Sequence, residues 1–149
     1  MLQIKELCME HIEEIKTFFV GIFTDEPWND DWSDPVQLHA YMIDLIGNRN
    51  SFVLGLFENE AMIGLSIGSI KHWYSGTEYY IDELCIKKEK QGHGLGTRFL
   101  KEIETFIKQK GMNQIFLQTK RTIPAYDFYK KNGYFELEDY VSMVRKLES

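Results

Sequence analysis

The sequence predicts an α+β (mixed α/β) fold with about seven strands in a mostly antiparallel sheet and about four flanking helices. Segments with apolar residues at helical spacing alternate with short apolar runs typical of strands. Three such runs follow one another between residues 51 and 88, and a helical segment then separates them from the next. This order indicates an antiparallel meander followed by one crossover helix. The chain has 149 residues and neither a repeat nor a linker, so we expect a single domain over residues 1–149.

The N-terminal third predicts one strand and two helices. Residues 2–6 form a short strand, and apolar side chains recur at helical spacing over residues 9–23. A second helix is expected to begin at Asp34, a good N-cap residue, because Pro35 follows at the first helical position. Gly47 is expected to end it.

The remainder predicts the sheet and two further helices. Residues 51–58 and 61–71 read as strands joined by a tight polar turn, and residues 77–88 read as a third. The later elements are a helix from Leu95 closed by Gly111, a strand over 113–120, a short helix over 124–133, and closing strands over 134–136 and 140–146.

Composition excludes several classes of protein. Apolar residues make up 44% and charged residues 27%, which is ordinary for a soluble globular chain, and the N-terminus lacks the apolar stretch of a signal peptide. The two cysteines are too few for a disulfide framework, and Cys8 with His11 lacks a second ligand pair for zinc. The net charge of −6 argues against nucleic acid as a partner. We therefore expect a cytoplasmic monomer or homodimer without metal, membrane or nucleic-acid partners.

The charge is unevenly distributed along the chain. Residues 25–34 hold five acids and no base, whereas residues 87–101 hold five bases and the single acid Glu89. Solvated faces are the ordinary interpretation of such runs. The alternative is that they form the acidic and basic ends of one cleft.

Three glycines lie within residues 92–96, between a predicted strand and a predicted helix. Glycine leaves backbone amides uncovered, and a helix start carries partial positive charge, so this segment is suited to bind phosphate. It is not a P-loop, because Gly96 is followed by Thr97 and Arg98 instead of Lys and Ser or Thr. It also lacks the sixth-position glycine of the dinucleotide fingerprint.

Two motifs resemble the GNAT superfamily of acyl-CoA-dependent N-acetyltransferases. Gln91, Gly94 and Gly96 match its Gln/Arg-x-x-Gly-x-Gly/Ala signature. A second block near the C-terminus matches at the family's spacing, with Thr122 where the family carries an asparagine that contacts the cofactor arm; its matching residues are Ala125, Phe128, Tyr129, Gly133 and Tyr134. The order of elements agrees over essentially the whole chain, which implies a GNAT-like fold.

The resemblance implies where acetyl-CoA binds. Backbone groups of the strand before the loop would hold the pantetheine arm, and the loop amides would hold the pyrophosphate. The residues concerned are Leu84, Cys85, Ile86, Gln91, Gly92, His93, Gly94, Leu95, Gly96, Thr97 and Thr122. Lys90, Arg98 and Lys131 are candidates for the outer phosphates, and the pattern does not choose among them.

Amide formation from a thioester needs an acceptor for the amine proton and a donor for the departing thiolate. A carboxylate suits the first task and a phenol the second. Tyr129 matches the family tyrosine that meets the sulfur. For the base, the sequence offers Asp82 and Glu83; Asp82 is favoured because some aminoglycoside 6'-N-acetyltransferases carry an Asp in a similar Ile-Asp-x-Leu element. Successive strand residues face opposite sides, so at most one of the two points straight at the acceptor unless a bulge shifts the phase.

The acceptor is expected to be a cationic primary amine, such as an amino sugar, an aminoglycoside or a polyamine. In the family the connection between the first two helices borders the acceptor, and here it contains acids together with Trp28 and Trp32. These tryptophans fit a cation site and packing on the core equally well. The alternative functions are a protein or peptide N-acetyltransferase and, from another class, a non-catalytic acyl-CoA-binding module.

Overall fold

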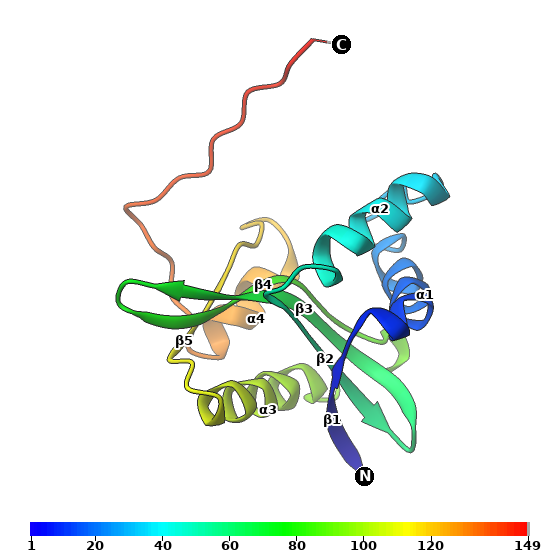
Figure 1. The fold of residues 1–149 in the computed structure, drawn as a ribbon, viewed down its shortest axis with the longest axis horizontal. Coiled ribbons are helices and arrows are strands. Elements are labelled where there is room, and N and C mark those ends of the chain that lie inside the picture. The colour runs from blue at the N-terminus through cyan, green and yellow to red at the C-terminus, as the bar shows by residue number, and fades with distance from the viewer. Residues whose placement is uncertain (149) are drawn as a thin grey trace. The chain divides into compact units, whose positions relative to one another are not determined.

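A five-stranded sheet organises residues Met1–Gln118 of the computed structural model, which describes residues 1–148 of the chain (Figure 1). Neighbouring strands follow sequence order, and β1 to β4 pair antiparallel while β5 runs parallel to β4. The strands are β1 (Leu2–Leu7), β2 (Ser51–Glu58), β3 (Ala61–Trp73), β4 (Gly76–Ile86) and β5 (Gln114–Leu117). The predicted α+β fold is confirmed, with a sheet of five strands.

Three α-helices accompany this sheet, namely α1 (Ile12–Phe23), α2 (Pro35–Ile46) and α3 (Leu95–Gln109). The predicted limits of α2 are confirmed: Oδ1 of Asp34 accepts hydrogen bonds from the amides of Val36 at 3.0 Å and Gln37 at 3.3 Å, and Gly47 follows the last turn. A 3-10 turn, η1 (Met9–His11), replaces the start of the predicted first helix. Over residues 1–148 the helices are all too short or too polar to cross a bilayer.

The helices bury two separate apolar cores against the sheet. The first joins α1 and α2 to one face, with Phe19, Met42 and Ile67 fully buried. The second joins α3 to the other face, with Tyr79, Phe99 and Ile103 fully buried. The core in which a strand residue packs therefore indicates the face of the sheet to which its side chain points.

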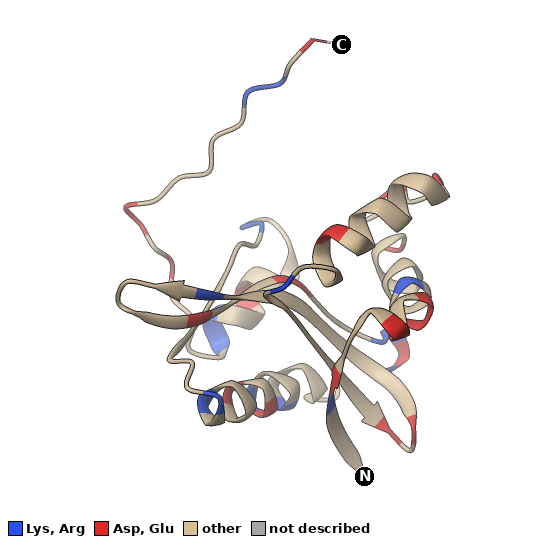
Figure 2. Cartoon of the chain, in the orientation of Figure 1, with Lys and Arg blue, Asp and Glu red and all other residues tan. Residues whose placement is uncertain are grey.

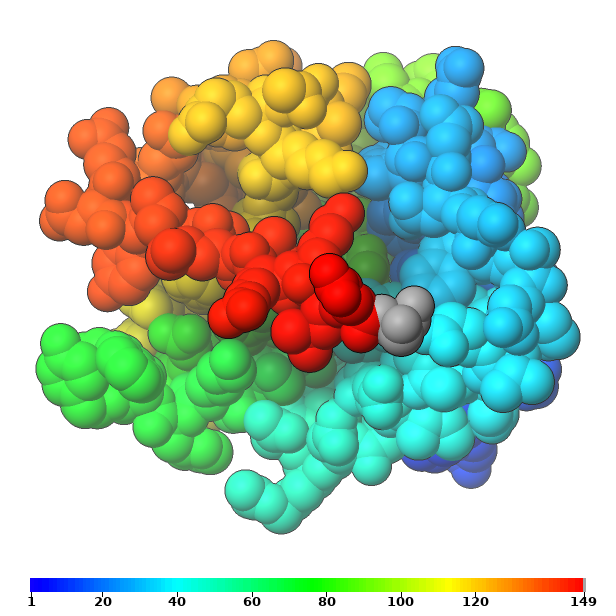
Figure 3. Space-filling view, turned by 90° about the horizontal axis from the view of Figure 1, so that it is seen from above, coloured from blue at the N-terminus to red at the C-terminus, as the bar shows by residue number. Residues whose placement is uncertain are grey.

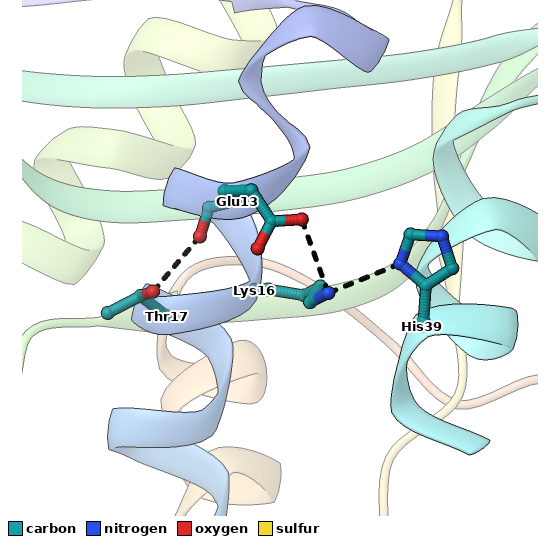
Figure 4. A network of polar contacts seen from close by, with 4 residues as sticks. All are labelled: Glu13, Lys16, Thr17 and His39. Atoms are coloured by element: carbon teal, nitrogen blue, oxygen red, sulfur yellow. Dashed lines mark hydrogen bonds and ion pairs between the residues drawn. The ribbon is translucent and has the colours of Figure 1, made fainter. Parts of the chain in front are cut away.

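A polar contact ties α1 to α2 at the surface (Figure 4). The Lys16 ammonium donates to Oε2 of Glu13 at 3.3 Å and to Nδ1 of His39 on α2 at 3.2 Å. The Thr17 hydroxyl donates to the Glu13 carbonyl at 3.0 Å, one turn back along α1. The two helices thus share an apolar core on the side of the sheet and are bridged at the surface by the Lys16 ammonium.

A second compact unit begins at Thr119. It contains α4 (Pro124–Lys131), and the Arg121 guanidinium pairs with Glu136 at 3.2 Å. The expectation of a single domain over residues 1–149 stays a prediction.

The strands predicted over 134–136 and 140–146 do not form in the described residues, and the strand predicted over 113–120 is confined to β5. Aromatic residues in the first segment and Tyr140, Val141 and Val144 in the second are typical of strands, but a strand also needs a partner for its backbone. No described strand pairs with either segment, and Val141, Met143 and Val144 are exposed.

Candidate active site

A bulge in β4 brings both predicted carboxylates toward the α1/α2 side of the sheet. Across from β4, Ile67 faces Glu83 and Gly68 faces Ile81, so Asp82 is an extra residue without a partner on β3. Before the bulge, Ile81 packs in the α3 core. After the bulge, Leu84 packs against the α3 core and Cys85 lies in the α1/α2 core. Strict alternation would have turned Glu83 toward α3. The bulge reverses the phase and turns it toward α2.

Gly68 makes this bulge possible. A Cβ at that position would collide with the backbone carbonyl oxygen of Tyr80 and lie 2.6 Å from the Tyr79 ring. Tyr79 in turn is locked by its hydroxyl, which donates to the Phe52 carbonyl at 3.0 Å and contacts the Ser66 hydroxyl at 2.7 Å. The irregular part of β4 therefore rests on a rigid core.

Glu83 is held by a tyrosine on α2. The Tyr41 hydroxyl donates to Oε1 of Glu83 at 2.7 Å. Burial raises the pKa of Glu83 to about 7, the bond from Tyr41 lowers it in part, and the nearby charges of Asp30 and Asp82 raise it further. A carboxyl group that titrates near neutrality is well matched to act as a general base at physiological pH.

Asp82 has a different environment. Its side chain is exposed, and its pKa is raised by partial burial but lowered by the charge of Lys71. Two adjacent carboxylates thus differ in solvent access and in partners, and Glu83 is the more strongly perturbed.

An aromatic stack supports Tyr41. The Trp32 ring lies on the Tyr41 ring with centroids 5.1 Å apart and planes 15° apart, and both rings contact Phe19. Trp28 packs against Phe23 at 4.9 Å. Both tryptophans of the α1–α2 connection therefore pack on the core, and the buried Nε1 of Trp32 has no hydrogen-bond partner within residues 1–148. Figure 3 shows this connection and α2, coloured blue to cyan, forming a continuous stretch of surface.

The predicted cofactor segment of β4 has a free backbone edge in the described part of the chain. β5 pairs with Glu78–Ile81 and ends there, whereas β4 continues to Ile86 with β3 alone beside it. The lysine amide after β4 donates to the Ile63 carbonyl of β3, so by alternation Cys85 faces β3 while Leu84 and Ile86 direct their amides and carbonyls away from it. These outward groups have no strand partner among residues 1–148. An extended ligand chain can pair with such an edge.

The glycine loop follows directly. After η2 (Lys88–Lys90), the Gln91 side-chain amide donates to the Ile86 carbonyl at 2.9 Å and closes the loop onto the end of β4. Gly92 and Gly94 have φ values of 81° and 77°, and a Cβ at either would meet open space. Glycine is therefore required there by the backbone conformation rather than by crowding.

The loop leads into the N-terminus of α3. Gly94 is the N-cap residue, and the amide of Arg98 makes the first helical bond, to the Gly94 carbonyl at 3.1 Å. The amides of Leu95, Gly96 and Thr97 precede that bond and have no acceptor within the helix. His93 is exposed beside them. The residues fit a phosphate group, because several amides are uncovered at a helix start.

The acidic and basic runs meet at one ion pair. Lys88 lies 3.5 Å from Asp25, which joins the η2 turn to the α1–α2 connection. Lys90 is engaged by Glu58 at 2.8 Å, whereas Arg98 is exposed on α3. Figure 2 shows acidic residues on β4 and in the α1–α2 region, and acidic and basic residues interspersed along α3.

The second predicted motif lies in the second unit. Tyr129 is buried on α4, with its ring 5.3 Å from Phe128 and 5.4 Å from Tyr134, while Thr122 is exposed before the helix. Their roles in acid catalysis and cofactor binding stay predictions.

Residues Cys8, Glu10 and His11 offer ligand atoms within 4.8 Å of one another. Nδ1 of His11 already accepts a hydrogen bond from the Cys8 amide at 3.0 Å, so this cluster is explained by capping of the η1 turn.

Sequence reasoning missed Tyr41 and Asp30. Tyr41 fits the apolar periodicity of α2, which by itself predicts only a core residue, and Asp30 is one of five acids in its run. The available signal was the hydroxyl on that buried face, since a buried tyrosine usually finds a polar partner.

Residues 9–134 match the model of the acetyltransferase (GNAT) family, and the chain therefore belongs to that family of acetyltransferases. No curated protein matches its sequence.

Solved structures share the fold at low sequence identity. An aminoglycoside acetyltransferase from an uncultured soil metagenomic sample, in complex with sisomicin, is 20% identical with a TM-score of 0.72, covering 99% of this chain and 97% of its own. Aminoglycoside N-acetyltransferase AAC(6')-Iy, in complex with CoA, is 14% identical with a TM-score of 0.72, covering 98% and 95%. A ribosomal-protein-alanine N-acetyltransferase from Brucella melitensis is 13% identical with a TM-score of 0.74, covering 99% and 100%.

Proposed function

We propose that this acetyltransferase moves an acetyl group from acetyl-CoA directly to a cationic primary amine, such as an amino sugar, an aminoglycoside or a polyamine. The observation that carries the proposal is Glu83, a half-buried carboxylate held by Tyr41 where β4 bulges, on the same strand that leads into the glycine loop. An alkylamine has a pKa of about 10.4 and is mostly protonated at neutral pH. A base beside the thioester site is therefore needed before transfer.

In the proposed reaction Glu83 removes one proton from the bound ammonium group. The neutral amine nitrogen then attacks the thioester carbonyl carbon, the carbon–sulfur bond breaks, and the electron pair leaves with sulfur. Tyr129 is proposed, on the strength of its motif position, to protonate the thiolate. The nitrogen releases its second proton to water as the amide forms, and the Tyr129 phenolate takes a proton back from water. A backbone amide of Leu84, Cys85 or Ile86 would stabilise the oxyanion. Asp82 is the alternative base.

Acetyl-CoA is proposed to bind along the free edge of β4 and across the start of α3. Residues Leu84–Ile86 would pair with the pantetheine arm, and the amides from Gly92 to Thr97 would hold the pyrophosphate. Among the bases, Arg98 is preferred for an outer phosphate, because Lys90 is engaged by Glu58. No metal takes part in this proposal.

The acceptor is proposed to approach between the acids and the aromatic stack of the α1–α2 connection. Asp30 and Asp82 add negative charge around Glu83, which attracts a cation. A peptide N-terminus is the second candidate, since a ribosomal-protein-alanine N-acetyltransferase shares the fold.

The test is a turnover screen that measures CoA release from acetyl-CoA with three kinds of acceptor: an aminoglycoside, a polyamine and a peptide with a free N-terminus. We expect activity with one or both cationic small molecules. The Glu83→Gln variant should lose that activity, whereas Glu14→Gln, on the exposed face of α1, should retain it. Activity with the peptide alone would overturn the acceptor proposal, and full activity of Glu83→Gln would overturn the assignment of the base.

A further inference from the structure

Glu83 depends on a contact from outside its own strand. Its Oε1 is occupied by the Tyr41 hydroxyl at 2.7 Å, and Oε2 has no hydrogen bond within the described residues. One oxygen is thus fixed and the other is available to take a proton. A carboxylate held by one charge-assisted hydrogen bond has a defined orientation.

Tyr41 is itself constrained from two sides. Trp32 stacks on its ring from the α1–α2 connection, and Phe19 of α1 lies 6.0 Å away. The stack restricts the ring, so the hydroxyl is presented to Glu83 without further ordering cost. A residue that served packing alone would not need a hydroxyl at this position.

We propose that Tyr41 is a positioning residue, which orients Glu83 so that Oε2 receives the amine proton and which favours the ionised carboxylate that does so. This inference rests on the proposed function. Tyr41 also links Glu83, the proposed base, to the α1–α2 connection, where the acceptor is proposed to bind, because its ring stacks on Trp32.

The groups around Glu83 determine the direction of the effect. Tyr41 on α2 is the hydrogen-bond donor, whereas Asp30 on the connection and Asp82 on β4 oppose ionisation. The neighbouring Cys85 thiol is buried, and burial keeps its pKa well above the usual value, so it stays neutral. Removal of the Tyr41 hydroxyl takes away the contact that lowers the pKa of Glu83.

The experiment uses Tyr41→Phe, which keeps the ring and its stack on Trp32 and removes the hydroxyl. Carbon-13 NMR follows the side-chain carboxyl of Glu83 through a pH titration of the full chain, with Glu83→Gln used to assign the resonance. We expect the midpoint to rise by about one pH unit, the value of one hydrogen bond to a charged group. Tyr74→Phe, on the exposed β3–β4 turn, is the matched control and should leave it unchanged.

Kinetics provide the second measurement, with whichever amine the screen identifies. The acidic limb of the kcat/KM profile should move upward by the same amount in Tyr41→Phe, and kcat above the limb should fall about tenfold because the base is less well oriented. An unchanged NMR midpoint in Tyr41→Phe overturns the inference, whether or not an acceptor is known. If Glu83→Gln keeps full activity and the acidic limb of its kcat/KM profile, the proposed base is wrong. If Glu83→Gln loses activity while Tyr41→Phe matches wild type, only the positioning role of Tyr41 is wrong.

Discussion

The difference in unfolding free energy between Glu83→Gln and wild type should depend on pH. It should favour the variant more at alkaline pH than at acidic pH. Burial raises the pKa of Glu83 from 4.5 to about 7. Between these values the folded state holds a proton that the unfolded state has released, so the unfolding free energy of wild type falls as the pH rises. Stability linked to this group is therefore fully present below the unfolded pKa and is lost as the pH rises through the folded pKa. The rise in pKa corresponds to up to about 3 kcal/mol.

Glutamine resembles the protonated acid and accepts the same hydrogen bond from Tyr41, so its contribution does not titrate. From about pH 5.5 to about pH 8, the advantage of Glu83→Gln over wild type should grow by about 2 kcal/mol. Urea denaturation followed by circular dichroism at several pH values measures this difference. Glu14→Gln, an exposed substitution with the same change in charge, controls for the net charge of the protein. A difference between Glu83→Gln and wild type that does not vary with pH would refute the reasoning.

Three further substitutions separate the proposed roles. Gly94→Val places a β-branched residue at a φ of 77°, so it should sharply weaken acetyl-CoA binding by calorimetry while most of the fold persists, and unchanged affinity would contradict the phosphate assignment. Tyr129→Phe should slow single-turnover acetyl transfer by about 10²–10⁴-fold with cofactor affinity nearly unchanged; a wild-type rate would return Tyr129 to a packing role. Asp82→Asn should raise KM for a cationic acceptor in a salt-dependent way without moving the acidic limb of the pH profile, and a displaced limb would make Asp82 the base instead.

Local chemistry was sufficient to predict parts of the fold. Asp34, Pro35 and Gly47 delimit α2 because capping depends on the residues at the helix ends themselves. The glycine loop was predictable for the same reason. A positive φ at Gly92 and Gly94 favours glycine at those positions themselves.

Features that depend on contacts between residues far apart in the chain could not be predicted from the sequence. The sequence predicts a strand over residues 77–88 and leaves a bulge at Asp82 and Glu83 open, because the bulge depends on Gly68 across the sheet. Tyr41 lies 42 positions from Glu83, and its periodicity alone describes a core residue. The closing strands failed similarly, because residues 140–146 have strand-like side chains and no described partner strand.

The bulge also explains why two adjacent acids can perform different tasks. In a regular strand Asp82 and Glu83 would point to opposite faces, and one would be buried beneath α3. The extra residue instead keeps Asp82 exposed near Lys71 and turns Glu83 beneath Tyr41. Environments that push the ionisation of two carboxyl groups apart are the means by which a site assigns one group to hold charge and the other to exchange a proton. On this ground we propose that Asp82 attracts the cationic acceptor and that Glu83, the carboxyl group that the fold desolvates, deprotonates it in place of Asp82, which matched a family element.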